Sequence, residues 1–193
     1  MNMNGNLPQK RSFAISLDKN IALILELILL MLAGAFAFFL HAKLRIPLNI
    51  PGHHGLEFMA IFTLLRLNSN LKYAATIATI GTGIFLLVPG MGAANPVNSI
   101  SYLLPGLVLD LLFSLSKQKI RLLYMAAFAA GIAYMSIPLS RLLINLATAY
   151  PYMALYKFGP AYTILSFLFF GMLGGALGFG LNHVKSIFNK EKN

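Results

Sequence analysis

The sequence predicts an all-α polytopic membrane protein, with six transmembrane helices in one bundle and both termini in the cytoplasm. The chain is 58% hydrophobic and only 10% charged, and its mean hydropathy is +0.75. Soluble globular domains carry fewer apolar and far more charged residues, so that class is excluded. The length of 193 residues suits about six spans of roughly 20 residues each.

Lysine and arginine residues are distributed unequally between the two sides of the predicted membrane. Of the 15, three fall on one side, at Lys43, Arg45 and Lys157, and Arg141 lies inside the fifth span. The other eleven fall on the opposite side: Lys10, Arg11, Lys19, Arg66, Lys72, Lys117, Lys119, Arg121, Lys185, Lys190 and Lys192. The positive-inside rule makes that side cytoplasmic and predicts a multi-pass protein of the cell membrane. The same distribution explains the net charge of +10 without nucleic acid as a partner.

The first two predicted spans differ in length. Residues Ile21–His41 form an uninterrupted apolar run. The second run, Gly55–Leu67, would give roughly 20 Å of helix, which is short of a bilayer core of about 30 Å. We therefore expect residues 46–54, which contain two prolines, to dip into the membrane and complete the crossing.

The remaining spans are expected at Leu71–Val88, Ile100–Leu115, Leu122–Ala147 and Ala161–Leu181. Pro138 should kink the fifth of the six. Residues 1–20 are then a cytoplasmic tail, 21–184 the membrane domain and 185–193 a basic cytoplasmic tail. Because the chain has no cysteine, disulfides and thiolate metal sites are excluded.

Four charged residues lie inside predicted spans: Glu26, Glu57, Asp110 and Arg141. Such groups are costly in hydrocarbon, so they should face the bundle interior, where they are functional or paired. Glu57 and Arg141 share a depth near the outer surface and are expected to pair. Asp110 and Glu26 lie near the cytoplasmic ends of their spans. For them the alternative is a structural one, with the carboxylates reaching toward Arg66, Lys117 or Arg121.

The interrupted segment before the second span is the candidate small-molecule site. His53, His54 and Glu57 share one face of a helix, and Asn95 and Arg141 are expected at the same outer cavity. Two imidazoles and a carboxylate would suit a divalent metal, but the order His-His-x-x-Glu differs from the His-Glu-x-x-His metal motif. The third interpretation is structural: the two histidines lie at the water interface, and Glu57 in the first helical turn stabilises the start of the helix. We assign the five residues to substrate, with no metal or cofactor.

Small residues form stripes on the first and last spans. Ala33 and Ala37 are four residues apart on the first span, and Gly171, Gly174, Gly175 and Gly178 lie on the last. Such stripes let helices approach closely, within one chain or between subunits.

In its layout the chain resembles the substrate-binding S component of an energy-coupling factor (ECF) vitamin transporter. The resemblance covers the size, the six spans, the Ala33–Ala37 stripe and the loop from Lys43 to Gly55. It implies that a vitamin or related precursor is captured from outside the cell. It also implies that Ala33 and Ala37 dock, lipid-exposed, on a membrane coupling subunit that works with two ATPase subunits. The chain has no nucleotide-binding Gly-rich loop of its own, which agrees with a non-enzymatic uptake subunit.

Two other functions remain open from the sequence. One is an intramembrane metal-dependent enzyme that uses His53, His54 and Glu57. The other is a membrane scaffold or assembly protein whose buried charges are structural. A retained organic molecule, a stoichiometric metal, or neither would distinguish the three.

Overall fold

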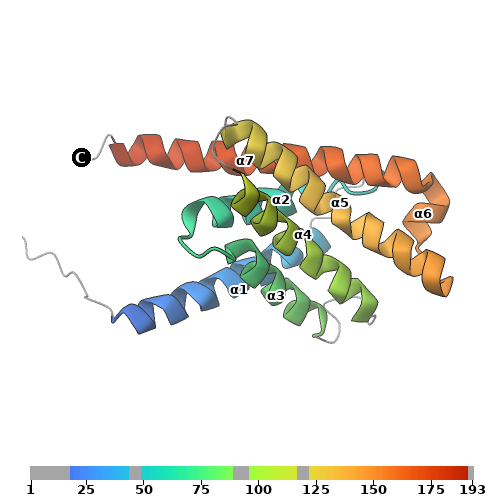
Figure 1. Cartoon of the computed structure of the whole chain (residues 1–193), viewed down its shortest axis with the longest axis horizontal. Helices are drawn as coiled ribbons and strands as arrows, with labels where there is room; N and C mark the ends of the chain where they lie inside the picture. The colour runs from blue at the N-terminus through green and yellow to red at the C-terminus, as the bar shows by residue number, and fades with distance from the viewer. Residues whose placement is uncertain (1–17, 44–48, 89–95, 117–121, 191–193) are drawn as a thin grey trace, which may run out of the picture.

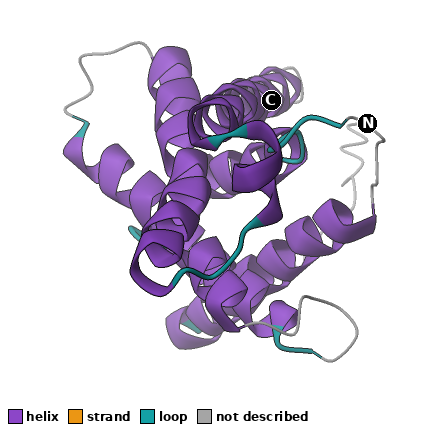
Figure 2. Cartoon of the chain, turned by 90° about the vertical axis from the view of Figure 1, so that its right-hand side faces the viewer, coloured by secondary structure: helices purple, strands orange, loops and turns teal. Residues whose placement is uncertain are grey.

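The computed structural model describes residues 18–43, 49–88, 96–116 and 122–190, without the side chains at 41–42, 96–99 and 189–190. Within these ranges the chain is helical and contains no strand, which confirms the all-α prediction (Figures 1 and 2). The helices are α1 (Lys19–Lys43), α2 (Gly55–Asn68), α3 (Ala74–Leu86), α4 (Pro96–Leu115), α5 (Leu122–Thr148), α6 (Met153–Phe158) and α7 (Pro160–Lys190).

Three of the described helices are long and apolar enough to cross a bilayer. They cover Lys19–Leu40, Leu122–Thr148 and Pro160–Phe188, within α1, α5 and α7. Large apolar side chains such as Leu29 and Leu146 are well exposed on them. An exposed apolar surface of this extent is typical of contact with lipid and not with water. Two shorter apolar helices, Ala74–Leu86 and Ile100–Leu115, lie in α3 and α4.

Six helices pack around one another in a closed order. Going round the bundle, α1 contacts α3, α3 contacts α4, α4 contacts α5, α5 contacts α7, α7 contacts α2, and α2 returns to α1. In Figure 1 the start of α1 and the end of α7 lie at the same, left-hand end, and α6 lies at the right. We call the region formed by the last turns of α5, by α6 and by the first turns of α7 the α6 end.

The glycine stripe on α7 is a packing surface within the chain. A Cβ atom on Gly171 or Gly175 would lie 2.9 or 2.5 Å from backbone oxygens of α5. A Cβ on Gly174 or Gly178 would lie 2.5 Å from backbone oxygens of α2. α7 therefore lies between α5 and α2, with one glycine pair facing each.

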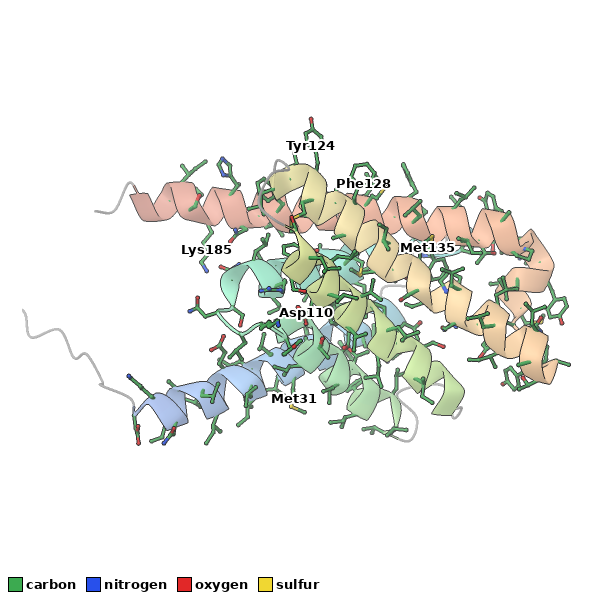
Figure 3. All side chains as sticks on the ribbon, in the orientation of Figure 1. Met31, Asp110, Tyr124, Phe128, Met135 and Lys185 are labelled. Carbon is green, nitrogen blue, oxygen red and sulfur yellow. The ribbon has the colours of Figure 1, made fainter. Side chains whose placement is uncertain are left out.

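Asp110 joins α3 and α4 to α2. Its carboxylate is 2% exposed and lies inside the bundle (Figure 3). It accepts hydrogen bonds from the backbone N–H groups of Ala75 (3.3 Å) and Thr76 (2.7 Å) and from the Thr76 hydroxyl (2.7 Å). The Arg66 Nε atom lies 3.0 Å from the Asp110 Oδ1 atom. Asp110 thus caps the first turn of α3 while its charge is matched by Arg66, which confirms the structural alternative for this residue.

Among the described residues, no basic side chain lies within 4.0 Å of the Glu26 carboxylate, and the expected partners Lys117 and Arg121 lie outside the described residues. Its carboxylate accepts a hydrogen bond of 2.6 Å from the Ser69 hydroxyl, which follows the end of α2. This contact links α1 to α2.

The last span and the loop before it differ from the sequence prediction. α7 continues through Lys190, nine residues past its expected end at Leu181, so most of the expected basic tail is helical. The expected loop before it contains the short helix α6. α5 covers Leu122–Thr148, with Pro138 inside it, close to the predicted Leu122–Ala147.

Candidate functional site

The described part of the interrupted segment, residues 49–54, packs against α7 at the α6 end; residues 46–48 lie outside the described residues. The Ser166 hydroxyl donates a hydrogen bond to the Pro51 carbonyl. Gly52 has a φ of +80°, and a Cβ there would lie 2.5 Å from the Phe167 ring, so the turn needs glycine for both conformation and space. At the start of α2, Gly55 lies directly against the Tyr134 ring of α5. Residues 51–55 therefore contact both α5 and α7.

The two histidines and Glu57 form a local cluster. The His54 Nδ1 atom lies 2.8 Å from the Glu57 Oε1 atom, three residues along the chain. The His53 Nδ1 atom lies 2.7 Å from the Ile50 carbonyl oxygen, and the ring centroids of His53 and His54 are 3.9 Å apart. Within the described residues, no group of three or more ligating side chains could hold a metal ion.

Glu57 and Arg141 do not form the expected ion pair. The carboxylate of Glu57 bonds to His54, one helical turn away, and this near partner satisfies it locally. Among the described carboxylates, none lies within 4.0 Å of Arg141. The two residues are nevertheless in the same region, because both interact electrostatically with the buried Tyr134.

Arg141 lies against aromatic rings. Its guanidinium carbon is 5.5 Å from the ring centroid of Tyr102, on α4, and 5.6 Å from that of Tyr152, which precedes α6. Its Nε atom is buried and has no hydrogen-bond partner among the described residues. Cation–π contacts stabilise the charge, but they supply no acceptor for the N–H groups.

A cavity of about 160 Å³ lies at the α6 end, bounded by the second half of α5, by α6 and by the start of α7. Phe167 lines it and also touches Gly52, so the cavity shares a wall with the interrupted segment. The described lining residues are Pro138, Arg141, Tyr152, Met153, Ala154, Leu155, Thr163 and Phe167. Arg141 is the one charged side chain among them.

Tyr152 brings a second polar group to this cavity. The residue is 8% exposed, and its hydroxyl oxygen is buried without a hydrogen-bond partner in the described part of the chain. Burial raises the pKa of the Tyr152 phenol, and the positive charge of Arg141 lowers it by less. The hydroxyl therefore stays protonated near neutral pH and is available as a donor.

The Thr163 hydroxyl has a different role. It donates to the carbonyl oxygens of Gly159, at 2.8 Å, and of Ala154, at 3.3 Å. These bonds hold α6 against the first turn of α7. Thr163 thus shapes the cavity and has only acceptor capacity left for a ligand.

Of the five residues predicted to bind substrate, the structure brings four to one region: His53, His54, Glu57 and Arg141. Asn95 lies outside the described residues. Sequence reasoning missed Tyr152, Thr163 and Phe167. The sequence carries tyrosines at positions 150, 152 and 156, but their spacing does not show which ring is buried.

The expected docking stripe on α1 is only partly exposed. Ala37 is fully buried in the core, so the prediction that it faces lipid is wrong. The reason is the close approach of α1 and α3, where the backbone of Gly34 meets that of Ala78 and the backbone of Gly81 meets that of Met31. Ala33 is half-buried. The small residues of α1 mainly serve packing within the chain.

Comparisons of the chain with protein-family models, with curated proteins and with solved structures find no match.

Proposed function

We propose that this chain is the membrane-embedded, non-enzymatic substrate-binding subunit of an uptake system for a small organic molecule. The observation that carries the proposal is the cavity at the α6 end, which is lined by apolar side chains and by Arg141 and Tyr152, two residues whose buried Nε and hydroxyl groups lack partners in the described chain. Small-molecule sites combine these features, an apolar concavity with few oriented polar groups. Energy for transport would come from a separate coupling subunit and two ATPase subunits.

In this proposal, the local cluster of His53, His54 and Glu57 positions the interrupted segment. Pro51 and Gly52 contact α7 at Ser166 and Phe167, and Phe167 is also a wall of the cavity. Movement of the interrupted segment would therefore open or close that wall. In this proposal the segment acts as the cover of the cavity, and the two histidines hold it in place.

The uptake proposal predicts a retained organic ligand. We expect native mass spectrometry of the detergent-purified protein to show one bound small organic molecule, released when Arg141 is replaced by Gln. A stoichiometric metal instead would favour an intramembrane enzyme. A protein carrying neither molecule nor metal would favour a scaffold and contradict the proposal.

We also propose six membrane crossings with both ends cytoplasmic, so that the α6 end faces outward. The distribution of eleven basic residues on one side and three on the other supports this orientation. The three long apolar helices supply half of the crossings. α2, α3 and α4 would supply the others together with the segments that flank them.

The orientation predicts where a reporter fused after Asn193 will be found. We expect a fluorescent reporter at this position to be active and a periplasmic phosphatase reporter to be inactive. The reverse pattern would place the carboxyl-terminal end of α7 outside the cell. Because that end lies opposite α6, the α6 end would then face the cytoplasm.

A further inference from the structure

We propose that the cavity at the α6 end binds a small, single-ring monocarboxylate, with its carboxylate on Arg141 and the Tyr152 hydroxyl and its ring against Phe167. This inference rests on the proposed uptake function and specifies the chemical class of its substrate.

The charge of the substrate follows from Arg141. Arg141 is the one charged side chain in the described lining, so the cavity wall carries a positive charge. Among the described residues no carboxylate lies within 4.0 Å of it, and its buried Nε atom has no acceptor. Arg141 is half-buried and has no described counter-ion, so an anionic occupant of the cavity would match its charge. A carboxylate matches the planar guanidinium with two parallel hydrogen bonds.

The hydrogen-bond donors of the residues that line the cavity also favour a negatively charged ligand. The Tyr152 hydroxyl is buried and unpartnered in the described chain, and it lies on the residue whose ring contacts Arg141. The Thr163 hydroxyl already donates to Ala154 and Gly159. Two residues that carry buried donors without described partners, Arg141 and Tyr152, therefore line a cavity whose described walls hold no carboxylate. Such a site favours a ligand that only accepts hydrogen bonds, as a carboxylate does.

The size of the substrate follows from the volume and walls of the cavity. A cavity of about 160 Å³ is close to one of about 150 Å³ that holds a benzene ring in another protein. Phe167, Met153, Leu155 and Pro138 give it apolar walls. Phe167 also stacks on Tyr134, with ring centroids 4.7 Å apart, so its ring is held in position to pack against a ligand ring.

The same features disfavour other anions. A phosphate monoester carries close to two negative charges near neutral pH, and the described walls offer a single cation. A multi-ring cofactor would exceed the volume. A dicarboxylate carries a second negative charge for which the described walls offer no second cation.

The test compares acids with their neutral amides. The wild-type protein in lipid nanodiscs is titrated calorimetrically with benzoate, pyridine-3-carboxylate and cyclohexanecarboxylate, and with the carboxamide of each. We expect at least one acid to bind, and its amide to bind at least 10-fold more weakly. An amide that binds as tightly as its acid, or failure of all three acids to bind, would overturn the proposal.

Variants assign the effect to the two polar groups. Arg141→Gln should abolish the preference for acid over amide, and Tyr152→Phe should weaken acid binding by about 2- to 10-fold. Lys157→Gln is the matched control, because Lys157 is an exposed cation of α6 outside the cavity lining and should leave binding unchanged. A preference for acid that survives in a folded Arg141→Gln protein would contradict the role of Arg141. The wild-type comparison decides the charge class even if that variant does not fold.

The identity of any molecule retained from cells separates this inference from the uptake proposal. A retained monocarboxylate supports both. A retained neutral or cationic molecule would overturn the acid class and leave the uptake function standing. A protein that retains no molecule and binds none of the acids contradicts both.

Discussion

Replacing Asp110 with Ala is expected to lower the free energy of unfolding by about 3–5 kcal/mol, a loss of roughly 10 °C in melting temperature. The carboxylate is 2% exposed and accepts hydrogen bonds from two backbone N–H groups and one hydroxyl at the start of α3. Its removal leaves these donors unsatisfied and leaves Arg66 without its anion. Thermal unfolding in detergent, followed by circular dichroism, measures the loss.

The matched control is Glu26→Gln. Glu26 is also a carboxylate in a predicted span, but it is half-buried and accepts one described hydrogen bond, from Ser69. We expect this substitution to change stability by less than about 1 kcal/mol. Equal losses in the Asp110→Ala and Glu26→Gln proteins would contradict the structural role of Asp110.

A pair of variants separates the charge of Asp110 from its capping role. Arg66→Met alone leaves a buried unpaired carboxylate and should be strongly destabilising. Adding Asp110→Asn removes that charge and keeps one acceptor oxygen, which can serve Thr76 or Ala75 but not both, because their N–H groups donate to different carboxylate oxygens. The double variant should therefore be more stable than Arg66→Met. If it is not, the ion pair is not the cause of the loss.

The regular parts of the fold were predictable because they depend on local chemistry. The apolar run of α5 is bounded by Arg121 and by the Ala149–Tyr150–Pro151 turn, and its ends were predicted within one residue. The glycines of α7 were predicted to mark a helix contact, and each of the four lies against a neighbouring helix. The short second span is likewise short in the structure, at 14 residues.

The partners of the charged residues were harder to predict. Sequence places Glu57 and Arg141 at a similar depth, but depth does not exclude a nearer partner, and His54 is one turn from Glu57. Arg66 was considered as a partner of Asp110 because the sequence predicts both near the cytoplasmic ends of their spans. The hydrogen bonds that make Asp110 the cap of α3 depend on how α3 and α4 cross, which no sequence pattern specifies.

The residues that line the cavity were not predicted because their burial also depends on how the helices pack. Tyr150 is exposed and Tyr152 is 8% exposed, although they are two residues apart in one aromatic-rich loop. The difference arises because α6 is held against the start of α7 by Thr163, which directs the Tyr152 ring toward Arg141. Burial of this kind depends on tertiary contacts and not on composition.

Replacing Gly174 with Ala is expected to separate α2 from α7 and to disturb the candidate site with it. The added Cβ would lie 2.5 Å from the Gly55 carbonyl oxygen and 2.7 Å from that of Leu56. Both are backbone atoms in the first turn of α2, so no side-chain rotation relieves the clash and the helix itself must shift. We expect a loss of about 2–3 kcal/mol in the free energy of unfolding, in the upper range for overpacking.

Gly180→Ala is the control on the same helix, because no atom lies within 4 Å of a Cβ at that position. Alanine is the better helix former, so this variant should be as stable as the wild type or more stable by up to about 1 kcal/mol. Thermal unfolding of both proteins in one detergent measures the difference. Equal melting temperatures would mean that α2 and α7 do not approach as closely as described.

The effect of Gly174→Ala on ligand binding tests whether the fold positions the site through this contact. Gly55 follows directly on His53 and His54, and Gly52 touches Phe167, so a shift of α2 would move these residues and one wall of the cavity together. We expect the folded fraction of the Gly174→Ala protein to bind the retained molecule at least about 10-fold more weakly, and the Gly180→Ala protein to bind it normally. Normal binding by a destabilised Gly174→Ala protein would show that the cavity is formed by α5, α6 and α7 without the help of α2.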